Sequence, residues 1–184
     1  MSLDNIKIKS NLRDYETSFI SDINKVLENY KDCHSIVDKK VYNLYKDKIE
    51  FPDENKRIEL EANEYTKSLD NLDNIIQHLL NNKIKRSNPL VVIGGGTIQD
   101  TASFISSILF RGIPWIFFPT TLLAQCDSCI GSKTSINFKK YKNQLGTFYP
   151  AEKIYVYTDI LKTLSKNDIL SGLGEIIKIY YIEG

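Results

Sequence analysis

Residues 89–100 read PLVVIGGGTIQD, and this stretch decides the fold class of the chain. The continuous apolar run over 90–93 is typical of a parallel strand that is buried on both faces. Three glycines follow at 94–96, and a helical pattern covers 97–110. A strand, a glycine turn and a helix in this order let the backbone approach a phosphate group at the helix N-terminus. Gln99 stands where the third glycine of G-x-G-x-x-G would be, so an ordinary tight turn remains the alternative.

Strand and helix patterns alternate on both sides of this stretch and predict a parallel α/β sheet. Strands are expected at 6–9, 34–37, 57–61, 114–118 and 153–157, and helices at 17–31, 41–49, 68–82 and 166–181. The helix over 68–82 has the clearest pattern, because its apolar residues recur every three or four positions. Residues 119–150 show no helical period and are expected to form a long polar loop with short strands. In such sheets, ligands bind outside the carboxyl ends of the strands.

Length and charge exclude several functional classes. The 184 residues suffice for one domain, and 24 Lys+Arg against 23 Asp+Glu give no basis for nucleic acid or an anionic membrane as the main partner. No apolar run approaches the roughly 18 to 20 residues of a membrane span. The N-terminal residues lack the pattern of a signal peptide, so a cytoplasmic protein is expected.

The cysteines and histidines predict structural roles. Cys126 and Cys129 form a C-x-x-C pair, but a structural zinc site needs about four Cys or His ligands, so these thiols are expected to fill a packed turn. His34 begins a predicted strand and His78 lies on the 68–82 helix, and both are interpreted as structural.

Several polar residues stand where a ligand site is expected. Thr120 and Thr121 follow a predicted strand, a position that suits a dinucleotide better than a core. Glu64 and Lys67 could bracket a ribose or adenine, although a solvated i, i+3 pair is the simpler alternative. Glu175 lies on an apolar helical face, where a carboxylate is costly unless it binds a metal or pairs with Lys178.

Together, these motifs resemble the sugar-phosphate cyclases, most closely the 3-dehydroquinate synthase family. The resemblance is strong over about residues 90–182 and weaker from Asp38 through Lys67. The residues that carry it are Gly94-Gly95-Gly96-x-x-x-Asp100, Arg111-Gly112-Ile113-Pro114, Pro119-Thr120-Thr121, Gln125, Asp127-Ser128, Lys133-Thr134, Ile136-Asn137, Lys142-Asn143, Gly146, Phe148-Tyr149, Thr158-Asp159, Leu161, Thr163-Leu164, Gly172-Leu173, Glu175 and Ile177-Lys178.

The resemblance implies a Rossmann-like NAD-binding domain over residues 4–164. It also implies that 165–182 begin an all-helical C-terminal domain that is otherwise missing, in a family that is expected to be homodimeric. The implied reaction is a lyase reaction of the shikimate pathway of aromatic amino acid biosynthesis, in which 3-deoxy-D-arabino-heptulosonate 7-phosphate loses phosphate and cyclises. NAD serves as a transient oxidant and a divalent metal, zinc or cobalt, polarises substrate oxygens.

The resemblance also assigns roles to individual residues. Those expected to face NAD are Asp38, Glu64, Lys67, Gly95, Gly96, Thr97, Asp100, Thr120, Thr121, Lys142, Leu161 and Thr163. Arg111, Asp127, Lys133 and Asn143 are expected to contact the phosphorylated sugar acid, and Glu175 to be one metal ligand. Gln99, Ser132 and Ser135 depart from the family's usual glycines, which bears on the choice of substrate.

Three hypotheses follow for the function. The first is the cofactor-binding portion of a 3-dehydroquinate synthase, inactive alone because one carboxylate cannot hold a metal that needs about three protein ligands. The second is another cyclase, of the 2-deoxy-scyllo-inosose or valiolone type. The third is an NAD-binding module without catalysis. Iron-type alcohol dehydrogenases share the architecture, but Lys133-Thr134 and Lys142-Asn143 favour the cyclases.

Overall fold

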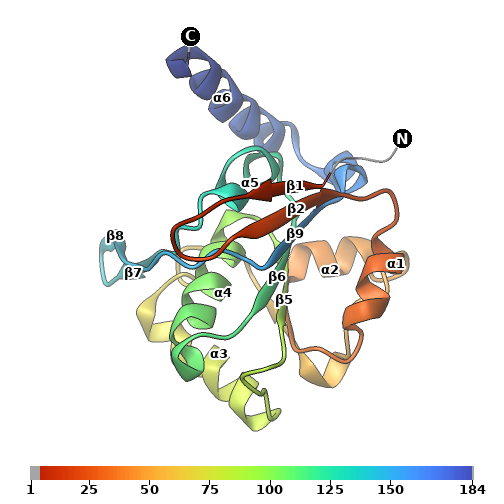
Figure 1. The fold of residues 1–184 in the computed structure, drawn as a ribbon, viewed down its shortest axis with the longest axis vertical. Coiled ribbons are helices and arrows are strands. Elements are labelled where there is room, and N and C mark those ends of the chain that lie inside the picture. Colours follow the sequence, from red (N-terminus) through yellow and green to blue (C-terminus); the bar gives the residue numbers. More distant parts are fainter. Residues whose placement is uncertain (1–4, 184) are drawn as a thin grey trace.

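The computed structural model describes residues 5–183 and shows a Rossmann-like α/β fold around one seven-stranded sheet (Figure 1). Residue 4, the expected start of the domain, lies outside the described residues. In spatial order the strands are β1 (Ile6–Ile8), β2 (Tyr15–Phe19), β9 (Lys153–Val156), β6 (Trp115–Pro119), β5 (Leu90–Gly94), β3 (Ser35–Asp38) and β4 (Arg57–Leu60). Every neighbouring pair is parallel except β1 with β2. The predicted fold class is therefore confirmed.

Helices cover both faces of the sheet. They are α1 (Ile23–Leu27), α2 (Lys39–Tyr45), α3 (Leu69–Asn81), α4 (Gly96–Ile108), α5 (Leu122–Cys126) and α6 (Lys166–Glu183). In Figure 1, α1 and α2 lie on one side of the sheet and α3 and α4 on the other. Because side chains alternate along a strand, Val92 of β5 packs in the core beneath α3 and α4, whereas Val91 and Ile93 pack in the core beneath α1 and α2. Burial of β5 on both faces explains its continuous apolar sequence.

The predicted helix over 17–31 is wrong in its first part. Tyr15 and Thr17 are buried on β2, whereas Glu16 and Ser18, which alternate with them, are less buried, which is the two-residue period of a strand. β2 pairs with β1 on one edge and, on the other, with β9, about 140 residues away in sequence. The helix begins only at Ile23, where the Asp22 side chain accepts hydrogen bonds from two backbone amides.

Most other predicted elements are confirmed, with shifted ends. The helix predicted at 41–49 is α2, which begins at Lys39 because Asp38 caps it. The polar region over 119–150 contains the short helix α5 and a separate hairpin of β7 (Ile136–Phe138) and β8 (Tyr141–Leu145). Short 3-10 helices η1 (Glu28–Tyr30), η2 (Glu54–Lys56), η3 (Leu109–Arg111), η4 (Ser128–Ile130) and η5 (Thr158–Thr163) complete the described chain.

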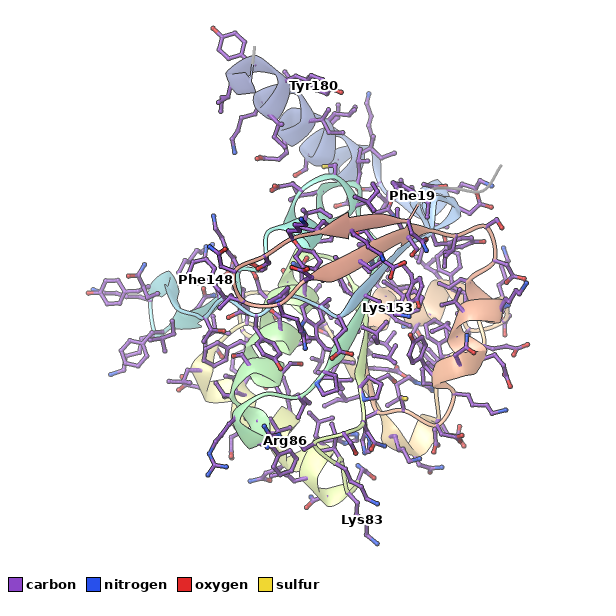
Figure 2. The ribbon with its side chains drawn as sticks, viewed as in Figure 1. Phe19, Lys83, Arg86, Phe148, Lys153 and Tyr180 are labelled. Carbon is purple, nitrogen blue, oxygen red and sulfur yellow. The ribbon has the colours of Figure 1, made fainter. Side chains whose placement is uncertain are left out.

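Two segments extend from the body of the domain. The β7–β8 hairpin lies at one side, and α6 points away from the sheet with Tyr180 exposed (Figures 1 and 2). Leu173, Ile177 and Tyr181 of α6 are also exposed, so the helix carries the apolar surface that the sequence predicts. Within residues 5–183, no helix is long and apolar enough to cross a bilayer.

His34 makes the stability of the domain dependent on pH. The ring is buried, its Nε2 atom lies 2.8 Å from the carbonyl oxygen of Asn82, and burial lowers the pKa of His34. The unfolded chain takes up a proton near pH ~6.5, whereas the folded ring resists it. We therefore expect the free energy of unfolding to be steady above about pH 7 and to fall as the pH drops below about 6.5.

Urea denaturation at pH 7.5 and pH 5.5 measures this loss. His34→Gln keeps a donor for Asn82 but has no titrating ring, so its decline should be smaller than that of the unchanged protein. His78→Gln is the matched control and should keep the decline. Equal declines in the two variants would show that His34 is not the group responsible.

Candidate cofactor and substrate site

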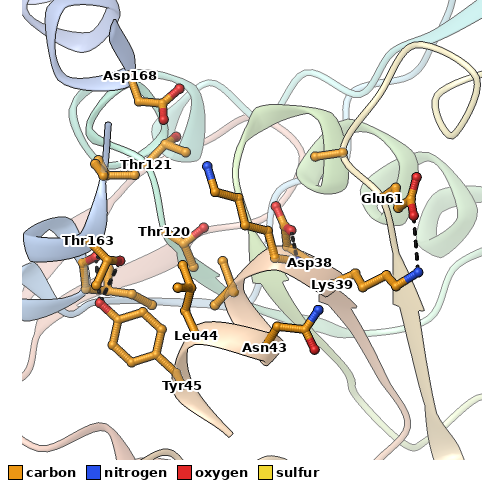
Figure 3. Close-up of a pocket in the computed structure, with 15 residues that line it drawn as sticks. Asp38, Lys39, Asn43, Leu44, Tyr45, Glu61, Thr120, Thr121, Thr163 and Asp168 are labelled. Atoms are coloured by element: carbon orange, nitrogen blue, oxygen red, sulfur yellow. Dashed lines mark hydrogen bonds and ion pairs between the residues drawn. The ribbon is translucent and has the colours of Figure 1, made fainter. Parts of the chain in front are cut away.

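The main cavity lies at the carboxyl ends of the parallel strands and has a volume of about 610 Å³ (Figure 3). It is bounded by the end of β3, the start of α2, the end of β6 and the η5 segment. Four of the residues predicted to face NAD line it, namely Asp38, Thr120, Thr121 and Thr163. The cavity therefore lies where a parallel α/β sheet binds its ligands.

The glycine turn joins β5 to α4 beside this cavity. Gly95 precedes the first residue of α4, and no side chain caps the helix there. The first amides of α4 are therefore available to an anion, and the positive end of the helix dipole favours one. A side chain on Gly95 would place its Cβ atom 2.8 Å from Cγ2 of Thr121, so the turn and the end of β6 pack closely.

Thr120 provides a second indication of a ligand. Its side chain is only 2% exposed and, in the described part of the chain, its Oγ1 atom has no hydrogen-bond partner. Buried hydroxyl groups are normally hydrogen-bonded, and an unpaired one costs about 1–3 kcal/mol. Since Thr120 lines the cavity, its hydroxyl is a candidate partner for a polar atom of a bound ligand.

Asp38 lies at the carboxyl end of β3, on the opposite wall of the cavity. One carboxylate oxygen accepts a hydrogen bond of 2.8 Å from the backbone amide of Lys40, which caps α2. Burial raises the pKa of Asp38, and the backbone hydrogen bonds of α2 oppose that rise. Near it, Thr163 is held by Tyr45, whose hydroxyl oxygen lies 2.9 Å from the threonine Oγ1. Leu161 packs against the core beneath α1 and α2.

Four of the residues predicted to face NAD form two ion pairs, Lys67 with Asp100 and Glu64 with Lys142. Lys67 forms an ion pair with Asp100 in the first turns of α4, and both side chains are largely buried. Glu64 instead binds Lys142 of β8 at 2.8 Å and Asn137 of β7 at 2.7 Å. Glu64 and Lys67 therefore have separate partners, and the alternative of a simple i, i+3 pair is wrong. These contacts hold the hairpin against the turn that follows β4.

A smaller hollow of about 380 Å³ contains two of the predicted substrate residues, Lys133 and Asn143. The amide oxygen of Asn143 accepts a hydrogen bond of 3.1 Å from the Ser135 hydroxyl, and the backbone amide of Asn143 donates to Asn137 Oδ1 at 3.0 Å. Asn143 has a positive φ of 56°, which asparagine tolerates better than most residues. Asn137 is among the residues that carry the family resemblance, but it was not assigned a role from the sequence.

Asp127 directly follows α5, and Glu175 lies on α6, the helix that packs against α5. Glu175 pairs with Lys178 at 2.5 Å, the structural alternative that the sequence left open. Glu175, and more weakly Asp127, raise the pKa of Lys178, which places both carboxylates near one ammonium group. No group of three His, Cys, Asp or Glu side chains that could hold a metal occurs in residues 5–183. The described residues therefore provide at most one part of a metal site.

Two predicted features lie apart from this arrangement. Arg111 ends η3 and is separated from β6 by residues 112–114, so it lies near the amino end of a strand whose carboxyl end leads into Thr120. Within one chain the structure does not bring it to the other candidates. Cys126 and Cys129 are free thiols bonded to carbonyl groups of α5, and burial raises the pKa of Cys129 to about 12. This placement supports the interpretation of a packed turn.

Comparisons with known proteins agree with this geometry. The family model for the 3-dehydroquinate synthase N-terminal region matches residues 57–171. The 3-dehydroquinate synthase of Clostridium tetani is 39% identical over 162 residues, which are 84% of this chain and 43% of that protein. That of Alkaliphilus metalliredigens is 42% identical over 146 residues, 78% of this chain and 41% of that protein. The chain thus spans less than half the length of these curated relatives.

Solved structures give the same picture of the fold. The 2-epi-5-epi-valiolone synthase of Streptomyces hygroscopicus, with NAD+ and Zn2+ bound, is 25% identical with a TM-score of 0.81, covering 96% of this chain and 51% of that chain. A 2-deoxy-scyllo-inosose synthase in complex with carbaglucose-6-phosphate, NAD+ and Co2+ is 22% identical with a TM-score of 0.79, covering 95% of this chain and 50% of that chain, and shows the fold alone. Since the family model covers more than half of the residues, the chain belongs to the 3-dehydroquinate synthase N-terminal family.

Proposed function

We propose that the chain supplies the NAD-binding side and part of the substrate-binding side of a 3-dehydroquinate synthase. The observation that carries the proposal is the cavity of about 610 Å³, which is lined by Thr120, whose hydroxyl has no partner in the described residues, and by Thr121, whose side chain packs against Gly95 at the uncapped N-terminus of α4. Named relatives that are 36–45% identical favour this function over other cyclases. The 2-epi-5-epi-valiolone synthase structure with bound NAD+ supports the choice of cofactor.

Different residues of the chain would bind different parts of NAD. The amides of Gly96 and Thr97 would bind a pyrophosphate, Thr120 would donate to or accept from the ligand, and Asp38 would accept from a ribose hydroxyl. Lys67 would orient Asp100, and Lys142 and Glu64 would hold the hairpin beside the cofactor. Bound NAD+ would supply transient oxidation of one hydroxyl group, which acidifies the neighbouring C–H and makes loss of phosphate possible.

The substrate would be held by cationic and polar groups. Lys133 and Asn143 share one hollow and would contact the phosphorylated sugar acid, together with Asp127. Arg111 is proposed as a further contact only on the resemblance, since it lies at the other end of β6. Glu175 offers one carboxylate to a zinc or cobalt ion, but the described residues do not complete a metal site, so no step is assigned to a metal. A homodimer and a cytoplasmic location are likewise proposals.

Phosphate release from 3-deoxy-D-arabino-heptulosonate 7-phosphate tests the function. The 184-residue chain alone should release negligible phosphate, whereas the complete protein that carries this chain should release it only when NAD is present. Lys133→Met should lower kcat/KM at least about a hundredfold, which corresponds to a loss of about 2.7 kcal/mol of transition-state binding. Lys139→Met is the matched control, because Lys139 lies on the exposed tip of the hairpin and should change the rate less than twofold.

The outcomes separate the three hypotheses. Activity on a different sugar phosphate would favour another cyclase, for which Gln99, Ser132 and Ser135 are the departures that bear on substrate choice. NAD binding with no phosphate release from any of these sugar phosphates would favour a binding module. Equal loss of activity in the Lys133 and Lys139 variants would contradict the assignment of Lys133 to the substrate.

A further inference from the structure

Gln99 makes a two-point contact that a glycine at the same position could not make. It lies in the first turns of α4 and is only 3% exposed. Its Nε2 atom donates to the backbone carbonyl of Ser128 at 2.6 Å, and its Oε1 atom accepts from the Ser128 hydroxyl at 2.7 Å. The side-chain amide therefore binds both the backbone and the side chain of one residue, 29 positions away.

The segment held by this contact follows a candidate substrate residue. Ser128 begins the 3-10 helix η4, and Asp127 immediately precedes it with φ −138° and ψ −72°, outside the helical and extended regions. In the described part of the chain, the exposed Asp127 carboxylate has no hydrogen bond of its own. The direction of its Cα–Cβ bond is set by the backbone on either side, through Leu123, whose carbonyl accepts the Asp127 amide, and through Ser128 after it.

The same contact reaches the proposed phosphate site. A Cβ atom built on Gly96 would have the Ser128 hydroxyl as its nearest neighbour, at 4.0 Å. Gln99 also donates its own backbone amide to the carbonyl of Gly95 at 2.9 Å. One residue thus joins the glycine turn to the turn that carries Asp127.

We propose that Gln99 is a positioning residue, which locks Ser128 onto the first turn of α4 and thereby fixes Asp127 relative to the glycine turn. The inference rests on the proposed role of Asp127 as a substrate contact. A glycine at position 99 would leave Ser128 without this partner. It adds no group to the cofactor site, because the Gln99 side chain points toward η4.

Gln99→Met tests the lock, because methionine has a similar volume but forms neither hydrogen bond. Amide hydrogen exchange in the 184-residue chain should become at least about tenfold faster at Ile130 and Gly131, whose amides bond to Asp127 and Ser128, while Val92 of β5 should change less. Ser128→Thr keeps the hydroxyl and the carbonyl and should retain slow exchange. Ser103→Ala removes another buried hydroxyl of α4, bonded only within the helix, and is the matched control.

Binding and kinetics distinguish positioning from a merely structural role. In Gln99→Met the dissociation constant for NAD should stay within about twofold, whereas the KM of the complete protein for the heptulosonate phosphate should rise at least about fivefold. Uniformly faster exchange over the whole domain, or local loosening with an unchanged KM, would overturn the proposal. If the unchanged complete protein releases no phosphate, the proposed function fails, and unchanged exchange at Ile130 and Gly131 would still overturn the lock.

Discussion

Replacing Lys67 by methionine is expected to lower the free energy of unfolding by about 2–3 kcal/mol, because it leaves a mostly buried carboxylate without its partner. The side chains of Lys67 and Asp100 are 12% and 23% exposed, and they form an ion pair. Burial already raises the pKa of Asp100, and Lys67 is the main group that opposes this rise. Removing the ammonium group therefore removes the interaction that offsets desolvation of the carboxylate.

Chemical denaturation measures the effect, and its pH dependence identifies the cause. In Lys67→Met the pKa of Asp100 should rise further, so lowering the pH from 7 toward 5 protonates the carboxyl and should reduce the deficit relative to the unchanged protein. Lys142→Met is the matched control: its pair with Glu64 is more than half exposed on both sides, and its loss should stay within about 0.5 kcal/mol. A deficit that is the same at both pH values would argue against an unpaired Asp100.

Replacing Gly95 by valine is expected to weaken NAD binding at least about a hundredfold while the domain remains folded. The φ angle of Gly95 is −86°, which any residue adopts, so the cause is crowding and not backbone strain. A Cβ atom would lie 2.8 Å from Thr121 Cγ2, and the turn would have to open. Opening displaces the first amides of α4, which are the groups proposed to bind the pyrophosphate.

Calorimetry with NAD measures the loss, and circular dichroism reports whether the domain stays folded. Gly174→Val is the matched control, because an added Cβ atom on Gly174 meets nothing within 4 Å and the residue is exposed on α6. It should leave the dissociation constant unchanged. A folded Gly95→Val domain that binds NAD as tightly as the unchanged protein would contradict the assignment of the cofactor to the glycine turn.

The central strands and long helices could be predicted because their signals are local. A strand buried on both faces must be continuously apolar, as β5 is, and α3 must repeat its apolar residues at helical spacing. The error at β2 has the opposite cause. Residues 17–31 carry apolar side chains at helical spacing, but Tyr15–Phe19 form a strand because β9 offers hydrogen bonds from a distant part of the chain.

In the candidate site, too, some features could be predicted from the sequence and others could not. The glycine turn comes at the end of β5, and Thr120 and Thr121 come directly after β6. Both strands end at the same edge of the sheet, so the sequence indicates these residues. The partners of the charged residues do not follow from the sequence. Lys67 pairs with a residue 33 positions away and Glu64 with one 78 positions away, and neither separation has a local pattern.

The sequence by itself determined the family, the α/β class and the residues that face the end of the sheet, because strand period, glycine turns and motif order are properties of neighbouring residues. Only the tertiary structure decided that Lys67 neutralises Asp100, that Gln99 holds Ser128 and that Arg111 lies away from the other candidates. The physical reason is that short-range hydrogen bonds and ion pairs depend on distances of a few ångströms. Chain folding sets those distances between segments that are remote in sequence.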